Sequence, residues 1–127
     1  MKAKNVGWFE IPVLDMERAT SFYETIFEIK IQAQQFGETK MGWFPYDHEN
    51  PQEGASGSLI MNPGHYKPSS NGVLIYFSSV EINDELSRVE GAGGVILQKK
   101  TQISPEVGFM AVILDTEGNR IALHSRE

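Results

Sequence analysis

Few side chains of this chain are suited to chemistry, and the most suggestive are Glu10 and His124. Glu10 lies in the aromatic and β-branched run V-G-W-F-E-I-P-V over residues 6–13, and His124 lies in the alternating run R-I-A-L-H-S over 120–125. Both runs are typical of β-strands. A partly buried carboxyl group beside an imidazole can move a proton to or from a substrate, because burial raises a carboxyl pKa and the neighbour decides which group holds the proton. The sequence therefore offers one candidate acid–base pair.

The same two residues have a simpler interpretation, which we prefer at this stage. Glu10 can bond a backbone group and His124 can lie at the exposed end of its strand, because buried polar groups are usually just satisfied. The other two histidines, His48 in D-H-E-N and His65 in P-G-H-Y, lie in loops. Adjacent residues such as those around His48 rarely converge on one ion. We therefore expect no metal site in these loops.

The composition limits the class of protein. A length of 127 residues, with 40% hydrophobic and 10% aromatic residues, suits one globular domain with a core. The 11 basic and 17 acidic residues give a net charge of −6, so we expect neither nucleic acid nor an anionic membrane as partner. No cysteine is present, which excludes disulfides, thiolate metal sites and cysteine nucleophiles. The N-terminus begins no long apolar run, and we expect a cytoplasmic protein.

Hydrophobic periodicity predicts the elements that position these residues. A helix is expected after Asp15, which occupies an N-cap position, and a second helix is expected from Ile82 to the Gly93-Gly94 pair. Strands are expected over 6–13, 29–34, 41–46, 57–62, 73–78, 95–99, 108–114 and 120–125.

The order of elements repeats after 66 residues. Asp15 and Glu81 each open a helix directly after a strand, and Tyr23 matches Val89 at the same offset. We interpret this as an internal duplication, in which neither copy buries its apolar face alone. The predicted organisation is one domain over 1–127, with modules 1–62 and 72–127 and a linker rich in Pro, Gly, Ser and Asn at 63–71.

Three segments in order carry a family resemblance over nearly the whole chain. They are W-F-E-I-P-V-L-D-M-E-R-A-T-S-F-Y-E-T-I-F, then Y-F-S-S-V-E-I-N-D-E-L-S-R-V-E-G-A-G-G, and finally V-I-L-D-T-E-G-N-R-I-A-L-H-S. Together they resemble the vicinal oxygen chelate superfamily, which includes glyoxalases, bleomycin resistance proteins and extradiol dioxygenases. The resemblance implies an α+β fold of two tandem βαβββ modules, whose eight strands form a cup-shaped mixed sheet with the helices outside and the site inside.

The resemblance also implies where a metal would be held in the metal-dependent members. Their ligands are histidines on the first strand of each module and a glutamate on the final strand, and glyoxalases add a glutamate on the fourth strand. The matching positions here are Trp8, Leu74 and Ala122, with the fourth near Ile60. Because these side chains cannot bind a divalent ion, we expect a member without the usual metal and without any cofactor.

The resemblance assigns candidate roles to the residues of the cup. Residues of one strand that are two apart share a face, so Glu10 faces the cup with Trp8, and His124 with Ala122. Glu10 and His124 can then approach each other across the cup as catalytic residues. The expected ligand-binding residues are Trp8, Tyr46, Leu74, Tyr76 and Ala122.

Two functions follow from this set of residues. The first is metal-independent binding of a small organic molecule in the cup of a homodimer, as in the bleomycin-resistance branch. The alternative is a glyoxalase-like lyase or isomerase that uses Glu10 and His124, or an atypical metal site. For a further aromatic residue, Phe44, we expect ordinary packing.

Overall fold

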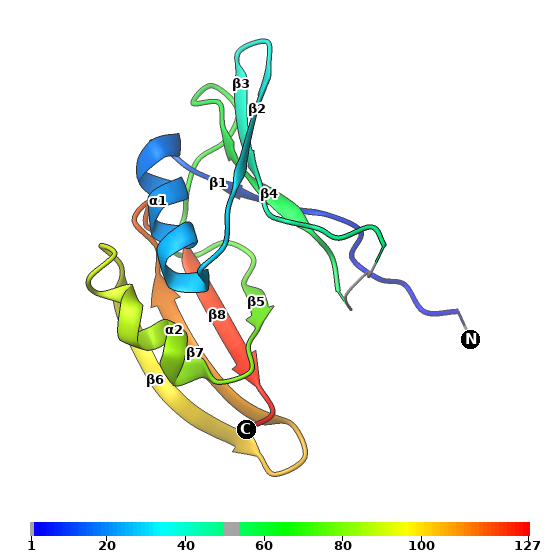
Figure 1. The fold of residues 1–127 in the computed structure, drawn as a ribbon, viewed down its shortest axis with the longest axis vertical. Coiled ribbons are helices and arrows are strands. Elements are labelled where there is room, and N and C mark those ends of the chain that lie inside the picture. The colour runs from blue at the N-terminus through cyan, green and yellow to red at the C-terminus, as the bar shows by residue number, and fades with distance from the viewer. Residues whose placement is uncertain (1, 50–53) are drawn as a thin grey trace.

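The computed structural model describes residues 2–49 and 54–127, and within them the chain folds into two helices and eight strands (Figure 1). The first half forms β1 (Phe9–Pro12), α1 (Met16–Phe27), β2 (Gln32–Phe36), β3 (Thr39–Trp43) and β4 (Gly57–Met61). The second half forms β5 (Ile75–Ser78), α2 (Ile82–Val89), β6 (Val95–Ser104), β7 (Gly108–Leu114) and β8 (Arg120–Ser125). The predicted α+β class, with the order βαβββ repeated twice, is confirmed.

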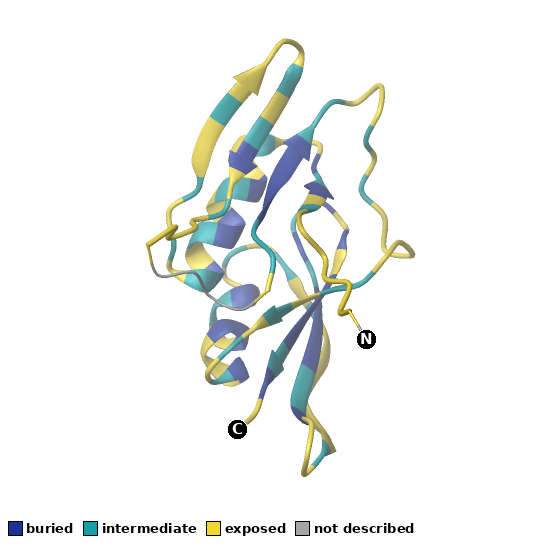
Figure 2. Cartoon of the chain, turned by 90° about the vertical axis from the view of Figure 1, so that its right-hand side faces the viewer, coloured by how far each residue is buried: buried dark blue, intermediate teal, exposed yellow. Residues whose placement is uncertain are grey.

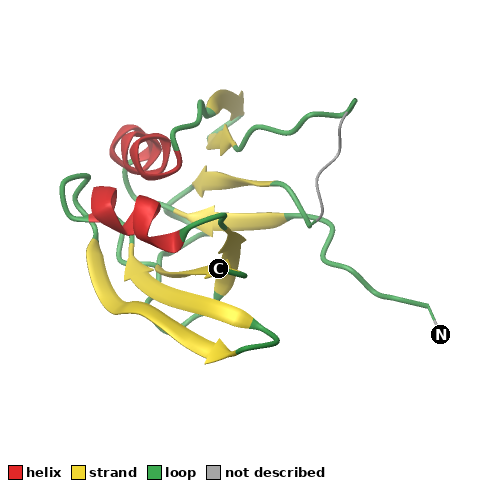
Figure 3. Ribbon diagram, turned by 60° about the horizontal axis from the view of Figure 1, so that its bottom comes forward, coloured by secondary structure: helices red, strands yellow, loops and turns green. Residues whose placement is uncertain are grey.

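The eight strands divide into two four-stranded sheets of equivalent topology. Their strand orders are β1-β4-β3-β2 and β5-β8-β7-β6. In each sheet the first pair is parallel and the remaining pairs are antiparallel, so both sheets are mixed. Figure 1 places the first sheet above the second, and Figure 3 shows both helices together on one side of the strands. Neither described helix is long and apolar enough to cross a membrane.

The two predicted helix starts are confirmed. The Asp15 carboxylate accepts a hydrogen bond from the backbone N–H of Arg18 at 3.0 Å, and the Glu81 carboxylate accepts one from Asn83 at 3.0 Å. Each cap satisfies one of the free N–H groups of the first turn. After α2 the chain turns at Gly94, where an added Cβ would come within 2.6 Å of the Phe22 ring. The glycine is therefore required for close packing between the two halves.

Several strand ends differ from the prediction, because pairing and not local pattern sets them. Of the range 6–13 that was predicted as a strand, only β1 forms one, and it pairs with β4 over four residues. Residues 2–8 extend away from the sheets (Figure 1). The strand predicted over 95–99 continues to Ser104 because β6 forms a long hairpin with β7. Register shifts along this hairpin indicate β-bulges. Because a bulge interrupts the alternation of apolar residues, the local pattern does not predict the full length of this strand.

One cluster of buried apolar side chains joins both helices to both sheets. The sheet faces that are turned to the helices contribute Ile11, Leu59, Ile113 and Leu123. Figure 2 shows the buried residues on the inner faces of the helices and along the central strands. Because neighbouring residues of a strand point to opposite faces, the other face of each sheet presents the alternate residues. The candidate site residues that belong to strands lie on that second set of faces.

Candidate functional site

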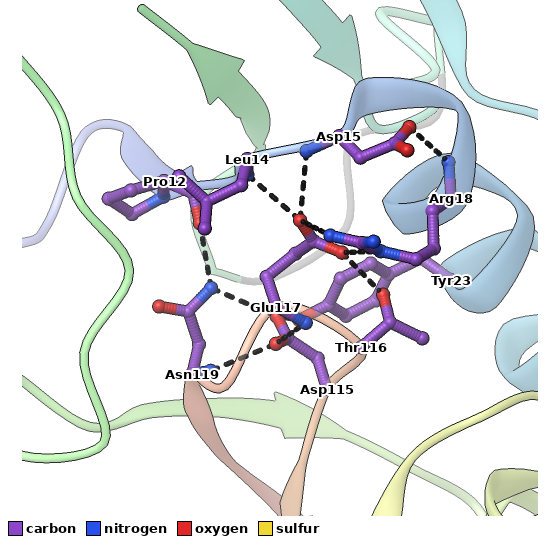
Figure 4. A network of polar contacts seen from close by, with 9 residues as sticks. All are labelled: Pro12, Leu14, Asp15, Arg18, Tyr23, Asp115, Thr116, Glu117 and Asn119. Carbon is purple, nitrogen blue, oxygen red and sulfur yellow. Dashed lines mark hydrogen bonds and ion pairs between the residues drawn. The ribbon is translucent and has the colours of Figure 1, made fainter. Parts of the chain in front are cut away.

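A buried carboxylate, Glu117, connects the last hairpin to the start of α1 (Figure 4). Its side chain is fully buried, with 0% exposed. One carboxylate oxygen accepts hydrogen bonds from the backbone N–H groups of Leu14 at 2.8 Å and Asp15 at 2.9 Å. The other lies 2.7 Å from Nε of Arg18 and 2.9 Å from Oγ1 of Thr116. These contacts join segments that are about a hundred residues apart in the sequence.

The pKa of Glu117 reflects these contacts. Burial alone would raise it, but the hydrogen bond from Arg18 and those from three further donors outweigh burial and lower the pKa to about 2. The carboxylate therefore stays charged at neutral pH and has donors on both oxygens. A carboxylate so fully engaged is a poor proton acceptor, so we assign it a structural role.

Asp115 forms the second half of the same network. Its carboxylate accepts hydrogen bonds from the buried Tyr23 hydroxyl at 2.6 Å and from the side-chain amide of Asn119 at 3.0 Å. The amide of Asn119 also donates to the Pro12 carbonyl at 2.7 Å. Burial, with the charge of Asp115 adding to it, raises the pKa of Tyr23 well above its ordinary value. In the sequence D-T-E-G-N appears only as part of the family resemblance; its two acidic residues beside an asparagine are the signal that could have indicated the network.

The structure does not bring Glu10 and His124 together in any contact among the described residues. Glu10 is exposed on β1 and lines a cavity of about 190 Å³ with Lys67 and Arg120. His124, near the end of β8, donates from Nε2 to the Val107 carbonyl at 2.7 Å. In the single chain Glu10 is exposed, on β1 at the edge of its sheet.

Two of the predicted ligand-binding residues, Trp8 and Tyr46, line one cavity of about 440 Å³. Trp43 also lines this cavity and contacts Trp8 edge to face, with ring centroids 5.7 Å apart. The three rings remain 43%, 37% and 44% exposed for Trp8, Trp43 and Tyr46. Tyr46 also packs edge to face on the ring of His48 at 4.7 Å. The cavity is therefore a concave aromatic surface that is still open to solvent.

The other predicted ligand-binding residues belong to the second sheet. Tyr76 on β5 is the register partner of Ala122 on β8, so the two side chains lie in one row across that sheet. Ala122 is fully buried, and Tyr76 is about half exposed. Leu74 directly precedes β5 and is partly buried. The predicted set thus divides between the two sheets of the chain.

The residues at the family's metal positions do not fit a divalent metal. Trp8, Leu74, Ala122 and Ile60 carry no metal-binding atoms, and Ile60 is 2% exposed. Across residues 2–49 and 54–127, no group of three or more His, Asp or Glu side chains is placed to hold an ion. These residues therefore give a metal no role in the chemistry of the site.

A further cavity of about 590 Å³ opens between the C-terminal end of α1 and the N-terminal half of α2. Phe44 lines it, and this ring also packs against the core, as predicted for that residue. No local sequence pattern predicts this cavity, because its walls come from five separate segments of the chain. Each phenylalanine in it has the pattern of an ordinary core residue.

Comparison with known proteins identifies the family. A sequence model of the Glyoxalase/Bleomycin resistance protein/Dioxygenase superfamily matches residues 5–123. The chain belongs to this superfamily. A glyoxylase-like domain-containing protein of Didymella fabae is 29% identical over 125 residues, which cover 95% of this chain and 93% of that protein.

Solved structures show the same fold at low sequence identity. A glyoxalase I variant from Zea mays superposes with a TM-score of 0.74 at 19% identity over 94% of this chain, which spans only 45% of the maize chain. TnmS3, an antibiotic binding protein from Streptomyces sp. CB03234, superposes with a TM-score of 0.65 at 20% identity, over 100% of this chain and 99% of that one.

Proposed function

We propose that this protein binds a small planar organic molecule, without a metal, on the aromatic surface formed by Trp8, Trp43 and Tyr46. The observation that carries the proposal is the pair of tryptophans packed edge to face and half exposed at a cavity of about 440 Å³. Large aromatic rings in a concave surface gain most when a flat ligand replaces water on them.

The relatives support binding more than catalysis. The superfamily includes bleomycin resistance proteins, and TnmS3 is an antibiotic binding protein of nearly the same length. Binding of a flat organic ligand needs apolar area and a few polar groups but no metal. An acid–base function would need Glu10 and His124 near one another, and no observation favours that arrangement.

We propose further that the working unit is a homodimer. Trp8 directly precedes β1 of one sheet and Tyr76 lies on β5 of the other, and both are large exposed aromatic residues. A second copy would cover these faces and bring the aromatic residues of two chains to one ligand, as the predicted cup requires. Exposed apolar surface of this kind is typical of an interface, and symmetric dimers are the commonest assembly. Light scattering at tens of micromolar protein should give twice the chain mass, and a monomer would contradict this part of the proposal.

Intrinsic fluorescence tests the binding site directly, because Trp8 and Trp43 are the two tryptophans of the chain. A panel of planar aromatic compounds, with bleomycin included, should contain members that quench this fluorescence with saturation. Trp8→Leu should weaken their binding about twofold to tenfold, because stacking on one ring contributes roughly 0.5–1.5 kcal/mol beyond buried area.

Phe36→Leu is the matched control for this experiment. Phe36 is an exposed aromatic residue on β2 that does not line the cavity, so its replacement should leave binding unchanged. Addition of EDTA should also leave binding unchanged. Full affinity of Trp8→Leu would place the site elsewhere, and loss of binding in EDTA would show that a metal takes part.

A further inference from the structure

The cavity of about 590 Å³ has an aromatic floor that the proposed function does not explain. Four phenylalanines line it, and their rings touch one another: the ring centroids of Phe27 and Phe77 are 4.8 Å apart, and those of Phe9 and Phe44 are 5.5 Å apart. Phe9 is the first residue of β1 and packs against the core, whereas Trp8 precedes the strand and is exposed. The cavity shares part of its wall with the tryptophan cavity but opens on the helix side.

Carboxylates surround this aromatic floor. Those that line the cavity belong to Glu28, Asp47, Glu81, Asp84 and Glu85. Within the described residues, Arg88 supplies the lining's one positive charge. Its guanidinium already donates two hydrogen bonds to the Ile26 carbonyl, at 3.0 and 2.8 Å, and lies 3.5 Å from the Glu28 carboxylate. The cavity therefore carries an excess of negative charge.

Glu85 is the residue that most needs a partner. It is only 8% exposed, on the inner face of α2 together with Ile82 and Val89. Among the residues that the structure describes, none donates a hydrogen bond to its carboxylate or forms an ion pair with it. Because it lines the cavity without a bonded donor, its carboxylate is available to a ligand there. The hydroxyl of Ser79, also in the lining, is a buried polar atom without a hydrogen-bond partner.

From this geometry we infer that the cavity is a binding site for a small hydrophobic organic cation, such as an ammonium group on an aromatic body. The phenyl faces attract a cation and accommodate an apolar body, while Glu85 and its neighbours balance the charge. Each alternative ligand fits less well. An anion would be repelled by the carboxylates, and a neutral apolar molecule would leave Glu85 unpaired. A bare metal ion would lack a group of three ligands in the described part of the chain.

Calorimetry with benzyltrimethylammonium tests this inference on the wild-type protein. The cation should bind with saturation, whereas N-benzylacetamide, which is neutral, should bind at least about tenfold more weakly. Phenylmethanesulfonate, an anion of similar size, should not bind. Equal binding of all three compounds would show a merely apolar cavity and overturn the inference, as would no binding of the cation.

Glu85→Gln provides the second arm of the test. The variant should bind benzyltrimethylammonium about tenfold more weakly and should melt near the wild-type temperature without ligand, because the Glu85 carboxylate has no hydrogen-bond or ion-pair partner among the described residues to lose. A carboxylate with only a structural role would give the opposite result, a lower melting temperature with unchanged affinity. That outcome would overturn the inference.

Glu90→Gln is the matched control, because Glu90 caps the same helix, is exposed and does not line the cavity. It removes the same charge and should bind the cation as the wild type does. Asp84→Asn, on the exposed rim, gives an independent measure and should weaken binding less than Glu85→Gln. Since this binding is read by calorimetry and depends on Glu85, it succeeds or fails separately from quenching of the two tryptophans.

Discussion

Replacement of Glu117 by glutamine removes a charge from the centre of the network in Figure 4 and keeps the shape of the side chain. The amide oxygen of glutamine can still accept the backbone N–H groups of Leu14 and Asp15. The amide nitrogen would then face Nε of Arg18, at a site where the carboxylate oxygen lies 2.7 Å away. Two donors would meet there, so the ion pair and its hydrogen bond are both lost.

The size of the effect follows from the pKa of Glu117. The fall from the ordinary value of 4.5 to about 2 corresponds to at most about 3 kcal/mol of folding free energy. Arg18 is 51% exposed, so water screens part of this interaction. We expect Glu117→Gln to lower the free energy of unfolding by about 2 kcal/mol at pH 7, and the melting temperature by about 5–10 °C.

The dependence on pH separates this mechanism from a simple packing defect. A carboxyl group whose pKa is lowered by folding stabilises the protein above its ordinary pKa of 4.5, and this contribution is lost as the pH falls through about 2. The difference between wild type and Glu117→Gln should therefore be constant above pH 5, shrink below 4.5 and nearly vanish at about pH 2.

Urea denaturation at fixed protein concentration measures this difference at each pH. Glu106→Gln is the control, because Glu106 is an exposed carboxylate in the turn between β6 and β7, and it should change stability by less than about 0.5 kcal/mol. A difference for Glu117→Gln below that of the control at pH 7 would refute the reasoning. A difference that stays the same from pH 7 to pH 2 would also refute it.

Three further predictions concern the network and the proposed site. Tyr23→Phe removes the 2.6 Å hydrogen bond to Asp115 and should cost about 1–2 kcal/mol in urea denaturation; an unchanged midpoint would contradict it. Elemental analysis of the purified protein should find no stoichiometric zinc, nickel, iron or manganese, and one tightly held equivalent would overturn metal-independent binding. Glu10→Gln should melt near the wild-type temperature because Glu10 is exposed, and it should leave binding of a planar ligand unchanged because Glu10 does not line the tryptophan cavity; a weakened affinity would extend the site to Glu10.

Local pattern was enough to predict the elements whose signals lie within a few residues. Asp15 and Glu81 are recognisable as helix caps because the capped N–H groups lie two or three residues further along the chain. The bounds of β7 and β8 follow from alternation alone, since both strands are long and partly buried. The order of these elements, repeated after 66 residues, indicated an internal duplication, and the family resemblance then implied the α+β fold.

The site depended on contacts that no local pattern contains. Alternation correctly separates Glu10 from Ile11, but whether the face of Glu10 is covered depends on what packs there, and a single chain leaves it exposed. The role of Glu117 appears only when the last hairpin lies against the start of α1, about a hundred residues away. In the sequence Glu85 is an ordinary polar position of a surface helix. Only the structure shows that this residue is largely buried and lines a cavity together with the phenylalanines.

The sequence alone determined the class of this protein: its two βαβββ halves, its helix starts and the missing metal ligands at Trp8, Leu74 and Ala122. The helix starts depend on residue type and spacing within one turn, and the metal positions were implied by the family resemblance. The tertiary structure decided which carboxylates are buried, which of them have partners, and which aromatic rings share a cavity. The physical reason is that burial and pairing are set by neighbours from distant segments, whose approach is decided by the packing of the whole core.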